Sequence, residues 1–201
     1  MLFSRLKVVG GRFECGQVRA RFLLPRSPGP PLKITVKMTH SSASKIIGRD
    51  EAARWVRELQ NRGLRVVFTN GCFDLLHPGH VDYLEEARSL GDALIVAVNT
   101  DASVRRLGKG PGRPVTPEQD RARVLAGLAA VDRVVLFDED TPLEILTALQ
   151  PDVLVKGGDY RLEEVVGRER IVARGGQVQV LPFRKGYSTT LLLKRLQRVD
   201  D

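Results

Sequence analysis

The 201-residue sequence predicts an α/β fold, namely a Rossmann-like, doubly wound parallel sheet of five strands in a single domain. Three observations lead to this prediction. Short apolar runs alternate along the chain with helical patterns. The runs are continuously apolar, which is typical of parallel strands that are buried on both faces. The length also suffices for one α/β domain of ordinary size and for little else.

The elements follow one another from residue 50 onward. Asp50 is expected to cap a first helix, and Gly63 to end it. The apolar runs predict strands over residues 65–69, 93–98, 134–137, 152–155 and 178–181. A second helix is expected to follow the first strand and to run to Leu90, before Gly91.

Three more helices are expected in the second half of the chain. One begins at Pro117 and turns Val124, Leu125 and Leu128 inward. The next is capped by Thr141, with Pro142 in its first turn and an apolar face formed by Leu143, Ile145, Leu146 and Leu149. The last helix begins at Ser188, Thr189 and Thr190.

The N-terminal segment differs in composition from the rest. Residues 1–37 contain four prolines and a single acidic residue, and we expect residues 1–43 to be a disordered basic extension before a domain over residues 44–201. Three explanations are open: a mis-set start with Met38 as the true initiator, an organellar transit peptide, or a real basic arm. We favour Met38 because the domain pattern starts soon after it.

The charge distribution argues against a nucleic-acid partner. The first 37 residues carry eight lysine or arginine residues and one glutamate, so they account for +7 of the net charge of +8. The remaining residues, with 24 basic and 23 acidic side chains, are nearly neutral. A basic domain face, the usual electrostatic sign of nucleic-acid binding, is therefore not expected.

Composition limits the compartment and the metal chemistry. No run of about 18 apolar residues exists, so we expect no membrane span. Cys15 and Cys72 lie far apart in sequence, which disfavours a structural disulfide and favours a reducing, cytoplasmic location. No Cys-x-x-Cys or His/Cys cluster predicts a zinc site, and no residues are expected to bind a metal directly.

The turn after the first strand is the most informative segment, with the sequence GCFDLLHPGH over residues 71–80. A strand, a glycine-containing turn and a helix start present backbone N–H groups to a phosphate. His77 and His80 stand three residues apart at this helix start and therefore face the same side. A helix cap and a buried structural histidine are the plain alternatives. The pair in this setting favours charge stabilisation on a bound phosphate.

Three other segments suit phosphate binding. Lys156 ends the fourth strand and is followed by two glycines, although an ordinary Gly-Gly turn with a solvated lysine fits the same letters. Residues 184–190, RKGYSTT, place cations and hydroxyls at a helix start, where a simple N-cap is the alternative. Residues 109–114, KGPGRP, form either a mobile cationic cover or a solvated loop. The chain lacks a Walker A sequence, which disfavours a P-loop kinase or ATPase.

These residues resemble the HxGH nucleotidyltransferases. The longer stretches TNGCFDLLHPGHVDYLEEARSLGD, LIVAVNTDASVRRLGKGPGRPV, LVKGGDY and STT are similar to the D-glycero-D-manno-heptose 1-phosphate adenylyltransferase group, in its form without a fused sugar kinase. The resemblance covers about residues 44–198. It implies that the sugar 1-phosphate attacks the α-phosphorus of ATP and that pyrophosphate leaves, giving an ADP-heptose for lipopolysaccharide core synthesis.

The resemblance also implies roles for individual residues and partners. The expected catalytic residues are His77, His80 and Lys156. The expected nucleotide-binding residues are Gly71, Cys72, Phe73, Asp74, Gly79, Gly158, Asp159, Ser188, Thr189 and Thr190, and the further phosphate or substrate candidates are Lys109, Arg113 and Arg184. Mg²⁺ is expected to accompany ATP, the other substrate is a sugar 1-phosphate, and a homodimer is expected.

Two other functions stay open. Arg184 resembles the arginine of the cytidylyltransferase motif RTEGISTT, but Lys185 and Tyr187 depart from it. A CTP-dependent enzyme acting on glycerol 3-phosphate or phosphoethanolamine is therefore the main alternative. A nucleotide-binding or nucleic-acid-binding protein that uses the basic N-terminus is the third.

Overall fold

The computed structural model describes residues 12–15, 18–21, 41–158, 160–182, 184 and 186–197. The chain divides into two units, residues 1–39 and 40–201. In the first unit, β1 (Arg12–Cys15) pairs antiparallel with β2 (Val18–Arg21). The rest of residues 1–40 lies outside the described residues, so the expected disorder and the start at Met38 remain predictions.

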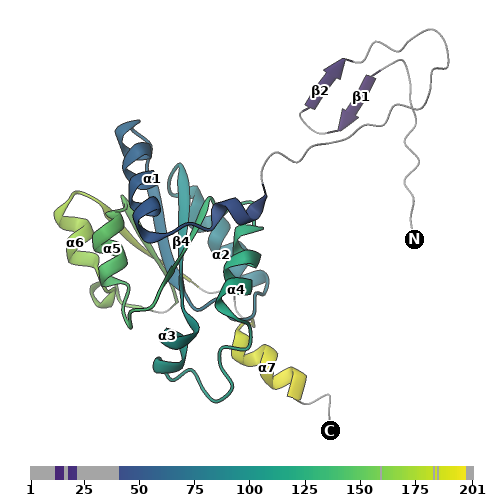
Figure 1. Ribbon diagram of the computed structural model, residues 1–201, viewed down its shortest axis with the longest axis vertical. Helices are drawn as coiled ribbons and strands as arrows, with labels where there is room; N and C mark the ends of the chain where they lie inside the picture. Colours follow the sequence, from purple (N-terminus) through teal and green to yellow (C-terminus); the bar gives the residue numbers. More distant parts are fainter. Residues whose placement is uncertain are drawn as a thin grey trace. The chain divides into compact units, whose positions relative to one another are not determined.

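The second unit contains a five-stranded, fully parallel sheet, as predicted. Its strands stand in the order β5-β4-β3-β6-β7 (Figure 1). They are β3 (Val66–Gly71), β4 (Ala93–Asn99), β5 (Arg133–Phe137), β6 (Val153–Gly157) and β7 (Gln177–Leu181). All five lie within two residues of the predicted ranges. β4 is buried along its whole length, as a central strand of a doubly wound sheet should be.

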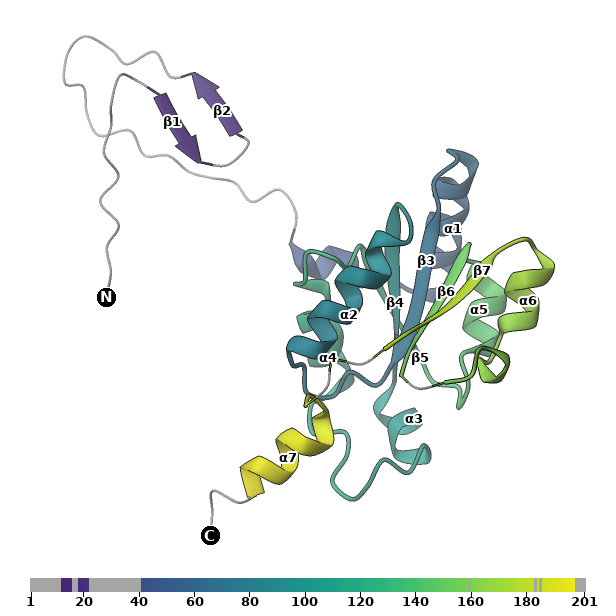
Figure 2. The same cartoon turned by 180° about the vertical axis from the view of Figure 1, so that it is seen from behind.

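Helices cover both faces of this sheet (Figure 2). α1 (Arg49–Asn61), α5 (Leu143–Leu149) and α6 (Arg168–Ala173) pack against one face around Val56, Ile145 and Ile171. α2 (Pro78–Ser89) and α4 (Glu118–Ala126) pack against the other face around Leu84 and Leu125. Burial of these two apolar layers is the main stabilising term of the fold.

Four further elements complete the description of this unit. α3 (Asp101–Arg106) follows β4, and α7 (Thr189–Gln197) ends the described chain; both lie at the same end of the sheet (Figure 2). A 3₁₀ turn, η1 (Ser42–Lys45), begins two residues before the expected domain boundary, and its Lys45 donates to the carbonyls of Leu128 and Val131. A second, η2 (Leu162–Glu164), follows β6. None of the described helices is long and apolar enough to cross a membrane.

Several local predictions were wrong. Gly48, and not Asp50, occupies the N-cap of α1. α5 starts at Leu143 after Pro142, and the expected cap by Thr141 is absent, since no side chain caps this helix. Val124 is half exposed, whereas the prediction turned it inward.

The error at Val124 has a physical reason. The inward positions of α4 on either side of it are taken by Arg121, Ala122 and Leu125. A buried arginine does not register as part of an apolar face, so Val124 was counted as an inward position in its place, whereas Leu125 is buried and Leu128 packs against the core as predicted.

Candidate active site

A pocket of about 590 Å³ opens where the carboxyl ends of β3 and β6 lie side by side. The chain proceeds from β3 to β4 and β5 on one side and places β6 and β7 on the other. This reversal is the switch point at which doubly wound sheets bind ligands. The lining side chains relevant here are those of Asn70, Cys72, Phe73, Asp74, His77, His80, Asn99, Lys109, Arg113, Thr141, Lys156, Tyr160, Glu164, Ser188, Thr189 and Thr190.

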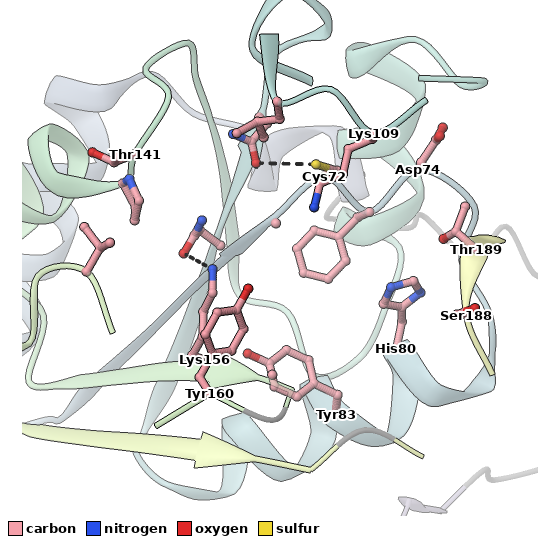
Figure 3. A pocket seen from close by; sticks show the side chains of 18 of the residues that line it. Cys72, Asp74, His80, Tyr83, Lys109, Thr141, Lys156, Tyr160, Ser188 and Thr189 are labelled. Atoms are coloured by element: carbon pink, nitrogen blue, oxygen red, sulfur yellow. Dashed lines mark hydrogen bonds between the residues drawn. The ribbon is translucent and has the colours of Figure 1, made fainter. Parts of the chain in front are cut away.

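The pocket has two ends. In Figure 3, Thr141 lies at one end, His80, Ser188 and Thr189 lie at the other, and Lys156 lies between them. A ligand with a phosphate chain and a second substrate could therefore meet at Lys156.

The two histidines form a stacked pair at the start of α2. Their ring centroids are 3.8 Å apart with an interplanar angle of 21°. His77 occupies the N-cap position without capping the helix through its side chain. The Nδ1 atoms of His77 and His80 are both buried and have no hydrogen-bond partner among the described residues. Two unpaired polar atoms at a pocket wall are costly unless a ligand pairs with them.

Burial sets the protonation of this pair. Desolvation, followed by repulsion from His77, lowers the pKa of His80 to about 4. Desolvation also lowers the pKa of His77. Both rings are therefore neutral at pH 7 in the free protein and can donate one hydrogen bond each to phosphate oxygens.

Gly79 gives the histidine pair its space. A Cβ atom at this position would lie 3.2 Å from Nδ1 of His77 and 3.3 Å from Cβ of Tyr187. Phe73, earlier in the same turn, adopts a φ of 46°, which is unusual for a residue other than glycine. The centroid of its ring lies 5.4 Å from that of the His80 ring, and the Phe73 ring also packs against Gly71. The turn is thus built tightly around the histidines.

Lys156 extends from the last part of β6 into the centre of the pocket. Its Nζ donates to Oδ1 of Asn70 at 3.4 Å and lies 5.7 Å from the Tyr160 ring. Desolvation lowers the pKa of Lys156. Asn70, at the end of β3, was missed by the sequence reasoning, although it directly precedes the Gly71 turn.

The Ser-Thr-Thr segment at the start of α7 contacts the turn over residues 71–80 that contains the two histidines. Oγ of Ser188 accepts from the N–H of Leu191, so the plain N-cap interpretation holds for this residue. The hydroxyl of Thr189 donates to the carbonyl of Leu75. Ser188, Thr189 and Thr190 all line the pocket, where the free N–H groups of a helix start favour an anion.

Asp74 has partners that the sequence did not reveal. Its side chain is fully buried and forms an ion pair with Nε of Arg113 at 2.7 Å. Oδ1 of Asp74 accepts the N–H groups of Val115 and Thr116. The carboxylate thus binds the loop after α3.

Arg121 was also missed. Its side chain is buried, pairs with Asp101 at 2.7 Å, and donates to the carbonyls of Thr116 and Cys72. The arginine therefore joins the loop after α3 to the histidine turn. A lone arginine in a helical pattern gives no sequence signal for such a role.

Cys72 has a free thiol at the pocket wall. Desolvation raises the pKa of Cys72, so the thiol stays protonated at neutral pH. Its Sγ lies 3.9 Å from Oδ1 of Asn99. A protonated thiol of this kind packs as a small side chain and is a poor nucleophile.

Two candidate residues do not line the pocket. Arg184 pairs with Asp82 at 2.7 Å on the surface and does not line the pocket, so its expected phosphate contact is not supported by the described geometry. Gly158 has a φ of 123° and donates its N–H to the carbonyl of Leu181. It follows the lining residue Gly157 but does not line the pocket itself. Asp159 lies outside the described residues.

Comparison with known proteins decides the family. The model of the cytidylyltransferase-like family matches residues 68–195, which include both histidines, Lys156 and the Ser-Thr-Thr segment.

The chain belongs to the cytidylyltransferase-like family. Within it, the chain is 53% identical over 169 residues to the bifunctional protein HldE of Citrifermentans bemidjiense, which covers 83% of this chain and 34% of that protein. It is 56% identical over 151 residues to the bifunctional protein HldE of Shewanella baltica, which covers 75% of this chain and 32% of the relative. The chain thus spans about a third of the length of these curated relatives.

A solved structure is similar as well. The lipopolysaccharide core biosynthesis protein from Thermoplasma volcanium is 32% identical, with a TM-score of 0.52 over 63% of this chain and 100% of that chain. The family match therefore identifies residues 68–195 as a nucleotidyltransferase domain.

Proposed function

We propose that this nucleotidyltransferase transfers AMP from ATP to D-glycero-D-manno-heptose 1-phosphate, which gives ADP-heptose and pyrophosphate. The observation that carries the proposal is the stacked pair of His77 and His80, whose buried Nδ1 atoms lack partners in a pocket that also contains Lys156. The sugar follows from the resemblance of the four sequence stretches, and the named lipopolysaccharide core protein from Thermoplasma volcanium supports it.

The reaction needs charge stabilisation and positioning, and no covalent enzyme intermediate. An oxygen of the sugar 1-phosphate forms a bond to the α-phosphorus of ATP, while the bond from that phosphorus to the bridging oxygen of the β-phosphate breaks. The electron pair leaves with pyrophosphate. His77 and His80 donate to the oxygens on which charge accumulates, and the α7 start binds the phosphate chain.

Lys156 is well placed to serve both substrates. It lies between the histidine end of the pocket and the end that contains Thr141 (Figure 3). We expect its ammonium group to draw the two phosphates together against their mutual repulsion. The sugar would then occupy the Thr141 end, where Tyr160 and Glu164 supply an aromatic ring and hydrogen-bonding groups.

Mg²⁺ fits this site as an ion carried by the nucleotide. The described residues contain no cluster of three or more His, Cys, Asp or Glu side chains that could hold a metal. The Asp74 carboxylate at the histidine end is already paired with Arg113. Mg²⁺ commonly keeps several waters and binds through substrate phosphates, where it neutralises charge and assists the departure of pyrophosphate.

A substrate screen tests the proposal. Each of the four ribonucleoside triphosphates is combined with Mg²⁺ and with heptose 1-phosphate, mannose 1-phosphate, glycerol 3-phosphate or phosphoethanolamine, and pyrophosphate release is measured. The proposal predicts the highest kcat/KM for ATP with heptose 1-phosphate. Turnover confined to CTP with glycerol 3-phosphate or phosphoethanolamine would establish the cytidylyltransferase alternative.

A further inference from the structure

The loop after α3 is attached to the domain at only a few points. Every hydrogen bond between residues 109–116 and another part of the described chain involves Asp74 or Arg121. The stretch before these contacts is open, since a Cβ atom at Gly108, Gly110 or Gly112 would meet nothing within 4 Å. These three glycines have φ values of 61°, 114° and 72°.

Lys109 projects from this open stretch into the pocket lining. Figure 3 shows it beside Cys72, at the side of the pocket where Asp74 also lies. Its charge reaches both neighbours: it partly offsets the burial that raises the pKa of Cys72, and it adds to the burial that lowers the pKa of Lys156. The glycine-rich backbone around Lys109 restricts the position of its side chain little. That position therefore depends on how firmly the residues that follow Lys109 are attached to the domain.

Asp74 provides that attachment. Its three acceptor contacts, to Nε of Arg113 and to the N–H groups of Val115 and Thr116, span 2.7–3.0 Å and are all made to the loop. The side chain is fully buried, and Arg113 is 11% exposed. A buried charge with three donors is held strongly, and hydrogen bonds to a carboxylate are stronger than neutral ones.

We propose that Asp74 is a positioning residue, which holds the loop over residues 109–116 so that Lys109 faces the phosphates, and that it does not bind the nucleotide itself. Its carboxylate is engaged by the loop and, as an anion, would repel a triphosphate that it touched directly. The substrate used in the kinetic test rests on the proposed function, whereas the structural test below needs no substrate.

Limited proteolysis of the full chain tests the attachment. Trypsin is added to the wild type and to Asp74→Asn, and mass spectrometry measures the rate of cleavage between Lys109 and Gly110. We expect Asp74→Asn to raise this rate at least about 10-fold, because cleavage follows local opening of the loop. The amide cannot accept from Arg113 and from the two N–H groups as the carboxylate does.

Asp132→Asn is the matched control. Oδ2 of Asp132 likewise accepts a backbone N–H, that of Leu94, and an arginine Nε, that of Arg88. It directly precedes β5 and does not line the pocket. We expect it to leave cleavage at Lys109 and the KM for ATP unchanged, even if it lowers stability.

Kinetics then separate positioning from direct binding. We expect Asp74→Asn to lower kcat/KM for ATP by about 10- to 100-fold, as a misplaced group near a reaction centre does. Combined with Arg113→Gln, it should lose no more than the worse single variant, because both changes release the same loop. Additive losses together with a wild-type cleavage rate at Lys109 would overturn the proposal and indicate direct contact with the nucleotide.

Two further outcomes keep the test decisive. If Asp74→Asn does not fold, Arg113→Gln alone must accelerate cleavage at Lys109, and a wild-type rate in that variant would refute the proposal. If no acceptor is turned over, the proposed function fails, while the cleavage rates still decide how the loop is held.

Discussion

The imidazole ring of His77 stacks on that of His80 with the ring centroids 3.8 Å apart. No described carboxylate pairs with either ring, and both buried Nδ1 atoms lack a partner. A stacked, neutral pair of this kind is suited to receive an anion and unsuited to carry two charges of its own. This arrangement leads to the following predictions.

Removal of the His80 ring should impair catalysis more than folding. We expect His80→Ala to lower kcat by roughly 10²–10³, the usual loss for one electrostatic donor in a transition state. Stopped pyrophosphate assays give kcat, and circular dichroism confirms the fold. Full activity in a folded His80→Ala protein would exclude the ring from the mechanism.

His80 should also make the fold sensitive to acid. Its pKa is about 4 in the folded protein and near 6.5 when unfolded, so the unfolded state binds the proton first as the pH falls. The free energy of unfolding therefore decreases between about pH 6.5 and pH 4, by up to about 3 kcal/mol from this group. Urea unfolding at pH 7, 5.5 and 4.5 should show a shallower decrease for His80→Asn than for the wild type. Parallel pH profiles would contradict the low pKa.

Gly79→Ala should disturb the histidine pair with little cost in stability. The added methyl group meets His77 and Tyr187, while alanine favours the helix over glycine by about 1 kcal/mol. We expect kcat/KM for ATP to fall about 10-fold or more, since a small displacement of a catalytic group is enough for such a loss. Gly48→Ala, at an open position before α1, is the control and should retain activity. Equal kinetics in both variants would show that the space at Gly79 is not needed.

Loss of Arg121 should destabilise the domain strongly. Arg121→Met leaves Asp101 and two carbonyls without their buried donor, and breaking such a pair costs about 3–5 kcal/mol. Arg106→Gln removes an exposed ion pair with Asp140, which solvent screens, and should therefore cost much less stability than Arg121→Met. Urea unfolding of both variants compares the two. A small loss for Arg121→Met would mean that water or a neighbour replaces its contacts.

Most of the sheet could be predicted from sequence because β3, β4, β5 and β6 each contain at least three consecutive apolar residues, whereas β7 alternates glutamine with apolar residues. The run at 93–98 corresponds to β4, which is buried at every position. α3 and α6 were not predicted, since helices of six residues contain too few turns to show a period. The prediction that Thr141 caps α5 was wrong. A threonine before a proline is typical of a helix cap, but here Thr141 lines the pocket instead.

The candidate site was predictable where neighbours in sequence remain neighbours in space. The histidines and Gly79 lie in one turn, and their proximity follows from the helix geometry. The contact from Asp74 to Arg113 spans 39 positions, and no local pattern reveals it. Arg184 seemed to belong to the phosphate site by its motif, yet Asp82 pairs with it on the surface.

Transfer of the α-phosphate label is the most direct test of the central claim. The wild-type protein is incubated with Mg²⁺, heptose 1-phosphate and ATP labelled with ³²P at the α-position, and the products are separated. We predict that the label appears in ADP-heptose, in an amount equal to the pyrophosphate released. Label that stays in ATP, while labelled CTP transfers its α-phosphate to an alcohol phosphate, would contradict the account.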